Sequence, residues 1–140
     1  MQPLKTSTQT KQTIRTPTTT TFSDAIRSAI HESMRMYRNV ICYGLGVPDP
    51  KCTFGTTLGL QKAFGKERVF DMPTSENAMT GIGIGASLAG IRPIITHQRL
   101  DFFLLALDQL INNAAKWRFM FGGNGCVPLT IRLIIGRGWG

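Results

Sequence analysis

The spacing of apolar residues changes several times after position 21. From residue 22 to residue 37 apolar side chains return every three or four positions, which predicts an amphipathic helix. Thr21 or Ser23 can cap this helix, and Asp24 lies in its first turn, where a carboxylate complements the helix dipole. The apolar run at 40–43 is short and continuous, which predicts a buried strand.

The same alternation continues along the rest of the chain. We expect further helices at about 57–64, 75–90 and 102–121, and further strands at 69–71, 93–96 and 127–135. Glycine and proline separate most of these segments. Short apolar strands that alternate with helices predict an α/β fold, an open parallel sheet with helices on both faces. This domain should extend over residues 22–140, with no second boundary.

The first 21 residues differ from the rest, since they are rich in Thr, Gln and Lys and have no apolar periodicity. We expect a disordered tail. A basic, acid-free start faintly resembles an organelle transit peptide, but it has few apolar residues. We therefore expect a cytoplasmic protein rather than one of the mitochondrial matrix. No apolar stretch is long enough to span a membrane.

The chain has a formal net charge of +8, and three of its basic residues lie in the tail. The remaining excess is compatible with nucleic acid, an anionic cofactor or an acidic partner. Basic and aromatic residues interleave at 116–119, but Trp117 and Phe119 cannot share one helix face, and no nucleic-acid-binding signature accompanies them. We therefore expect no nucleic-acid partner. No metal-ligand spacing is visible.

Three glycines, Gly81, Gly83 and Gly85, approximate a dinucleotide-binding fingerprint with Ala86 in the last position. A fingerprint should place its glycines in the turn after a strand, whereas these fall inside a predicted helix. Each glycine in a helix costs about 1 kcal/mol relative to alanine. Close packing of the helix backbone is the expected compensation, and nicotinamide binding is the weaker interpretation.

Glu76 lies between a predicted strand and a predicted helix, at the end of the sheet where open parallel sheets bind their ligands. The same position also suits a glutamate that only stabilises the helix dipole. The spacing alone leaves both interpretations open.

Longer motifs carry a family resemblance. Residues 68–76 and 81–93, together with 55–60 and much of 101–116, closely resemble the beta subunit of pyruvate and branched-chain 2-oxoacid dehydrogenases. The resemblance covers about residues 22–132. It implies a transketolase-like pyrimidine-binding fold, truncated at the C-terminus, and thiamine diphosphate as the cofactor.

By this resemblance, Glu76 hydrogen-bonds N1′ of the cofactor's aminopyrimidine and so helps to remove the proton from thiazolium C2. Phe102 matches the aromatic residue that packs on the pyrimidine, although without the resemblance it would be assigned to the core. Gln98 stands where family members carry a methionine in the same pocket, which leaves the substrate open. His97 is a candidate for proton exchange with the substrate, or a structural histidine.

The motif that holds Mg²⁺ and the diphosphate is absent from this chain. In the family it belongs to an alpha-type subunit, so the resemblance implies that partner, a contact between beta subunits and a heterotetramer. The isolated chain should be inactive. Two other functions stay open, a transketolase-like biosynthetic carboligase component and a non-catalytic subunit-interaction module.

Overall fold

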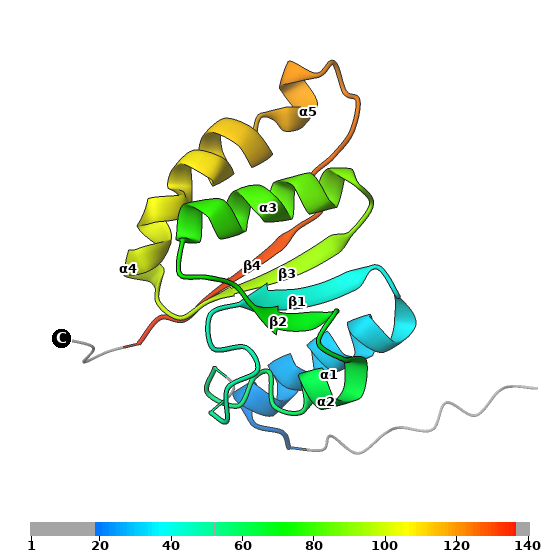
Figure 1. Ribbon diagram of the computed structural model, residues 1–140, viewed down its shortest axis with the longest axis vertical. Helices are drawn as coiled ribbons and strands as arrows, with labels where there is room; N and C mark the ends of the chain where they lie inside the picture. The colour runs from blue at the N-terminus through cyan, green and yellow to red at the C-terminus, as the bar shows by residue number, and fades with distance from the viewer. Residues whose placement is uncertain (1–18, 52, 137–140) are drawn as a thin grey trace, which may run out of the picture.

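The computed structural model describes residues 19–51 and 53–136, so most of the predicted tail lies outside the described residues. Its centre is one parallel sheet with the strand order β2-β1-β3-β4 (Figure 1). The strands are β1 (Val40–Gly44), β2 (Val69–Asp71), β3 (Arg92–His97) and β4 (Thr130–Leu133). The predicted α/β class and the parallel sheet are therefore confirmed.

Helices cover both faces of the sheet, as predicted. Helices α1 (Phe22–Met36) and α2 (Leu60–Phe64) lie on one face, and α3 (Glu76–Leu88) lies on the other with the later helical segments. Two apolar clusters reflect these two faces. The α1 side is filled by Ile30, Met34, Val40, Cys42, Val47, Leu60 and Val69. The α3 side centres on Tyr43, Met79 and Ile95.

The ends of the first two helices follow from local chemistry. Helix α1 is capped by Thr21, whose hydroxyl accepts a hydrogen bond from the Asp24 amide at 3.1 Å. Helix α2 begins at Leu60, three residues after the predicted start. The Thr57 hydroxyl instead donates to the Val47 carbonyl at 2.8 Å, and Gly59 has a left-handed φ of 79°. These two features delay the helix.

The prediction of one long helix over residues 102–121 is wrong. This layer consists of α4 (Leu100–Phe103), a 3-10 turn (Leu104–Ala106), a π-helical segment (Gln109–Ala114) and α5 (Trp117–Met120). Within the widened segment, Gln109 donates to Asn77 of α3 at 3.1 Å and accepts from Asn113 at 3.0 Å. These side-chain amides thus connect the π-helical segment to α3. Short π-helical segments often interrupt a regular α-helix.

The expected close packing of the glycine-rich helix holds at one of its three glycines. A Cβ on Gly83 would lie 2.6 Å from Cδ1 of Ile95 and 2.7 Å from the Tyr43 hydroxyl oxygen. A Cβ on Gly81 would make ordinary contact with Gln109, and one on Gly85 would meet nothing within 4 Å. Gly83 therefore brings α3 close to β1 and β3. In the part of the chain that is described, no helix has the length and apolar character needed to cross a membrane.

Candidate functional site

The carboxyl ends of β1, β2 and β3 meet at one edge of the sheet, and α3 begins beside them. A cavity of about 480 Å³ opens there, which we call the Glu76 pocket. Its apolar lining comes from Leu45, Met72, Phe102 and Leu105. Its polar lining includes Asp71, Glu76 and Gln98. Three residues singled out in the sequence, Glu76, Gln98 and Phe102, are thus brought together.

Glu76 is the first residue of α3, and its residue surface is only 6% exposed. Among residues 19–51 and 53–136, its carboxylate has no hydrogen-bond donor and no ion-pair partner. Although the residue is largely buried, it lines the open pocket, where its carboxylate can accept a hydrogen bond. A ligand in the pocket that donates a hydrogen bond would supply the partner that the Glu76 carboxylate lacks.

The first turn of α3 is held from two sides, which fixes the position of Glu76. The Tyr43 hydroxyl donates to the Met79 carbonyl at 2.8 Å from the sheet side. On the other side, Asn77 donates to the Leu105 carbonyl at 3.3 Å and accepts from Gln109. The carboxylate is therefore carried by a rigid element rather than by a loop.

Phe102 lies at the pocket rather than in the core. The residue is 48% exposed, whereas the neighbouring Phe103 is 3% exposed and takes the core position. The Arg99 guanidinium lies 5.3 Å from the centre of the Phe102 ring and pairs with Asp101 at 2.8 Å. The ring of Phe102 can therefore cover a flat ligand from the open side of the pocket.

His97, the last residue of β3, is fully buried and does not line the Glu76 pocket. Its ring packs edge-on against Phe103, with 4.9 Å between ring centres, and neither ring nitrogen has a hydrogen-bond partner. Burial lowers the pKa of His97, and the negative charge of Glu76 opposes part of that effect. The structure does not bring His97 to a surface that a substrate can reach.

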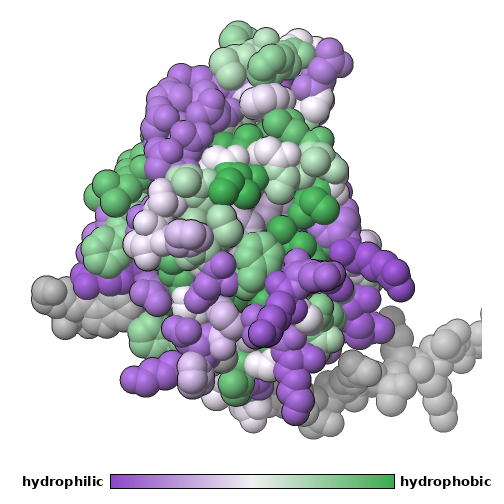
Figure 2. Space-filling model, viewed as in Figure 1, coloured by the Kyte–Doolittle hydropathy of each residue, from purple (hydrophilic) through white to green (hydrophobic). Residues whose placement is uncertain are grey.

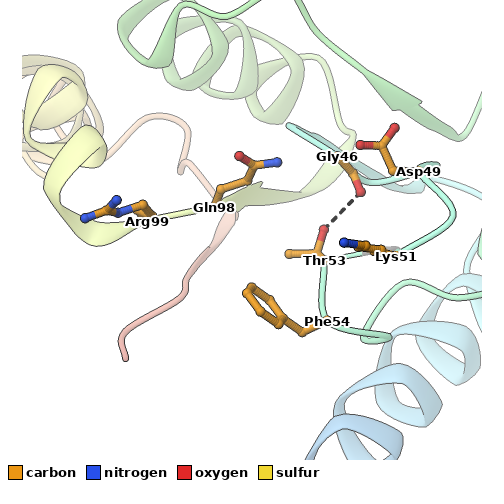
Figure 3. A pocket seen from close by; sticks show the side chains of 7 residues that line it. All are labelled: Gly46, Asp49, Lys51, Thr53, Phe54, Gln98 and Arg99. Carbon is orange, nitrogen blue, oxygen red and sulfur yellow. Dashed lines mark hydrogen bonds between the residues drawn. The ribbon is translucent and has the colours of Figure 1, made fainter. Parts of the chain in front are cut away.

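A second cavity, of about 450 Å³, adjoins the first, and we call it the Lys51 pocket (Figure 3). It shares Gly46 and Gln98 with the Glu76 pocket. Its other lining residues are Asp49, Lys51, Thr53, Phe54 and Arg99. Sequence reasoning treated this segment only as a loop.

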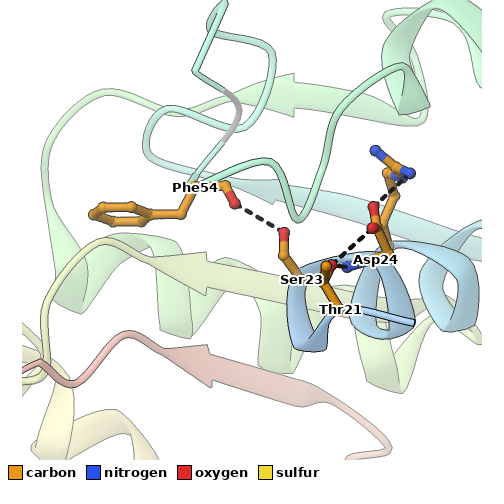
Figure 4. Close-up of polar contacts among 5 residues, drawn as sticks. Thr21, Ser23, Asp24 and Phe54 are labelled. Atoms are coloured by element: carbon orange, nitrogen blue, oxygen red, sulfur yellow. Dashed lines mark hydrogen bonds and ion pairs between the residues drawn. The ribbon is translucent and has the colours of Figure 1, made fainter. Parts of the chain in front are cut away.

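The loop that forms the Lys51 pocket is held by side-chain hydroxyls. Thr53 donates to the Gly46 carbonyl at 3.2 Å, and Thr56 donates to the Thr53 carbonyl at 2.8 Å. Ser23 of α1 donates to the Phe54 carbonyl at 2.9 Å (Figure 4). The concentration of threonines at 53–57 was the available sequence signal, because threonine hydroxyls often bond to nearby backbone.

Across residues 19–51 and 53–136, no group of three or more His, Cys, Asp or Glu side chains is arranged to hold a metal ion. Of the cysteines described, Cys42 is a buried free thiol and Cys126 an exposed one. Burial raises the pKa of the Cys42 thiol to about 11, which keeps it protonated.

Comparison with known proteins agrees with this geometry. Residues 18–132 match the family model for the transketolase pyrimidine binding domain. The chain is 38% identical to the pyruvate dehydrogenase E1 component subunit beta of Rhizobium meliloti, over 81% of this chain and 25% of that protein. It is 38% identical to the 2-oxoisovalerate dehydrogenase subunit beta of Bacillus subtilis, over 84% of this chain and 36% of the relative.

A third relative is the beta subunit of acetoin:2,6-dichlorophenolindophenol oxidoreductase from Bacillus subtilis, 37% identical over 84% of this chain and 38% of that protein. The chain thus spans between 25% and 38% of the length of these three relatives. The family match covers most of the described residues and includes the Glu76 pocket. The chain belongs to the family of transketolase pyrimidine-binding domains.

Proposed function

We propose that this domain is the beta-type half of a thiamine diphosphate site in a 2-oxoacid dehydrogenase, where Glu76 binds the aminopyrimidine ring. One observation carries the proposal. Glu76 is a largely buried residue whose carboxylate has no partner among the described residues and lines a pocket at the ligand-binding edge of a parallel sheet.

The residues of the Glu76 pocket fit an aminopyrimidine. Leu45, Met72 and Phe102 supply apolar contact for a flat ring, and Glu76 supplies the single strongly polar group that is deeply buried. Thiamine diphosphate, when bound, supplies the carbon nucleophile and the electron sink for decarboxylation of a 2-oxoacid. The role of Glu76 is to share a proton with a ring nitrogen, which a fixed carboxyl group can do.

The partner in this proposal is an alpha-type subunit that holds the diphosphate and Mg²⁺. The relatives are named as subunits, which supports assembly with other chains. Apolar surface that a partner can cover is present over the helical layer: Leu100, Leu104, Leu105, Phe119, Met120 and Phe121 are all at least 40% exposed. Figure 2 shows apolar surface around α4 and α5. A further contact between beta-type subunits is part of the same proposal.

The test uses the assembled complex that contains this domain, loaded with thiamine diphosphate and Mg²⁺. Exchange of the C2 proton of the bound cofactor for deuterium is followed by NMR after an acid quench. Glu76→Gln should slow this exchange by about 10²- to 10⁴-fold, as expected when a general acid–base group is lost.

The matched control is Glu67→Gln, since Glu67 is exposed and does not line the Glu76 pocket. It should leave the exchange rate unchanged. Equal exchange rates in the Glu76→Gln variant and the unaltered complex, both saturated with cofactor, would overturn the proposal.

A further inference from the structure

The Lys51 pocket differs in chemistry from the Glu76 pocket beside it. Among the described residues, the Glu76 pocket has four large apolar side chains, whereas Phe54 is the one large apolar side chain that lines the Lys51 pocket. Asp49, Lys51 and Arg99 bring charges, and Gln98 brings an amide. Figure 3 shows Lys51, Phe54 and Gln98 around the same hollow, while the Arg99 side chain points away from it.

Lys51 is the cation that this pocket can offer to a ligand. Arg99 is engaged elsewhere, since it pairs with Asp101 and lies over the Phe102 ring. Within the described part of the chain, the ammonium of Lys51 has neither a hydrogen bond nor an ion pair. Gln98 stands at the boundary of both pockets, where its amide N–H can donate to a second oxygen. An ammonium and an amide N–H that line one pocket can both donate to a carboxylate.

The wall of the pocket is built in a conformation that needs support. Thr53 and Phe54 have left-handed φ values of 48° and 59°, which residues other than glycine rarely adopt. The threonine hydroxyls and Ser23 hold this strained turn from within the loop and from α1. Arg132 of β4 also donates to Thr56 at 3.0 Å. Strain that is held in this way is common at ligand clamps.

The position of the pocket suggests which carboxylate it binds. The two pockets share Gly46 and Gln98, so a molecule that reacts beside the Glu76 pocket can extend into the Lys51 pocket. We propose that the Lys51 pocket binds the distal carboxylate of a dicarboxylic 2-oxoacid, and that this domain favours such substrates over branched-chain ones. The inference rests on the proposed function, because that function makes a 2-oxoacid the ligand.

The test measures binding to the chain without cofactor, so it does not depend on activity. Two probes are titrated into the ¹⁵N-labelled protein, 2-oxoglutarate and 2-oxoisovalerate, and the amide signals of Thr53, Phe54 and Gly55 are followed. We expect 2-oxoglutarate to shift these signals with millimolar affinity, and 2-oxoisovalerate to bind about tenfold more weakly or less.

Three variants locate the carboxylate. Lys51→Gln should weaken 2-oxoglutarate binding about tenfold or more, because a charged hydrogen bond is lost. Lys51→Arg keeps the positive charge and should keep most of the affinity for 2-oxoglutarate. This variant therefore distinguishes loss of the charge from a change in the conformation of the loop. Lys62→Gln removes a charge from α2, outside both pockets, and should change nothing.

The inference is overturned if 2-oxoglutarate does not shift these amides, if Lys51→Gln binds it as tightly as the unaltered chain, or if 2-oxoisovalerate binds as well. Failure of the proposed function has a different signature. In that case 2-oxoglutarate binding depends on Lys51 as expected, while Glu76→Gln leaves the rate of C2 proton exchange in the assembled complex unchanged.

Discussion

The hydroxyl of Tyr43 donates a hydrogen bond of 2.8 Å to the backbone carbonyl of Met79, and both residues are almost completely buried. This bond joins the carboxyl end of β1 to the first turn of α3, three residues after Glu76. The Tyr43 ring also stacks on Phe70 of β2, with 5.4 Å between ring centres and planes within 4°. The helix that carries Glu76 is therefore anchored to two strands through one side chain.

Removal of this hydroxyl should weaken the fold. Tyr43→Phe keeps the ring stacking but loses the hydrogen bond, so the free energy of unfolding should fall by about 1 kcal/mol in urea titrations. The matched control is Tyr37→Phe, since Tyr37 is 53% exposed. Its effect should stay within about 0.5 kcal/mol. Equal losses of unfolding free energy in the two variants would show that the Tyr43–Met79 hydrogen bond does not stabilise the fold.

Two glycines of α3 should respond in opposite ways to the same substitution. Gly83→Ala places a methyl group 2.6 Å from Ile95 and 2.7 Å from Tyr43, both of which are buried and cannot move freely. The free energy of unfolding should fall by about 1–3 kcal/mol. The new methyl group of Gly85→Ala meets nothing within 4 Å. Because alanine has a higher helix propensity than glycine, the free energy of unfolding should rise by about 0.5–1 kcal/mol.

Thermal or urea unfolding of the two alanine variants measures this difference directly. The role assigned to Gly83 is wrong if its alanine variant is as stable as the Gly85→Ala variant.

The stability of the protein should depend on the protonation of His97. Burial lowers the pKa of His97 in the folded chain, so the unfolded chain takes up the proton first as the pH falls. The contribution of the neutral imidazole is therefore fully present above the ordinary pKa of about 6.5 and is lost below it, by at most about 1.4 kcal/mol per pH unit.

The variant His97→Leu removes this titration without breaking a hydrogen bond, because neither ring nitrogen has a partner. Urea unfolding between neutral and mildly acidic pH should give a flatter pH dependence for the variant than for the unaltered chain. Identical pH dependence in both proteins would mean that His97 takes up its proton equally well in the folded state.

The sequence predicted the sheet well because its strands are short apolar runs between clear glycine and proline breaks. The position of Glu76 at the ligand-binding edge followed from the rule that open parallel sheets bind ligands at the carboxyl ends of their strands, whereas the position of Gln98 in the same pocket followed from the family resemblance. The break in the predicted helix 102–121 could not be seen, since it depends on side-chain contacts between Gln109 and Asn77 across two helices. Adjacent aromatic residues posed a similar problem, because the pattern does not decide which of Phe102 and Phe103 faces the core.

The threonines at 53, 56 and 57 indicate a loop held by hydroxyl groups, but the Lys51 pocket itself could not be predicted from the sequence. It depends on consecutive left-handed residues at Thr53 and Phe54, which no pattern of side chains predicts. It depends as well on the contact between Thr56 and Arg132, which lie far apart in the chain. Such features arise only from the tertiary structure, which holds a turn that the local sequence would not adopt.

A crystal structure of the assembled complex with bound thiamine diphosphate tests the central claim most directly. The decisive quantity is the distance from a Glu76 carboxylate oxygen to N1′ of the aminopyrimidine. The account predicts a hydrogen bond of about 2.6–3.2 Å, with the ring against Phe102. A Glu76 side chain turned toward His97 or paired with another residue, with the ring held elsewhere, would contradict it.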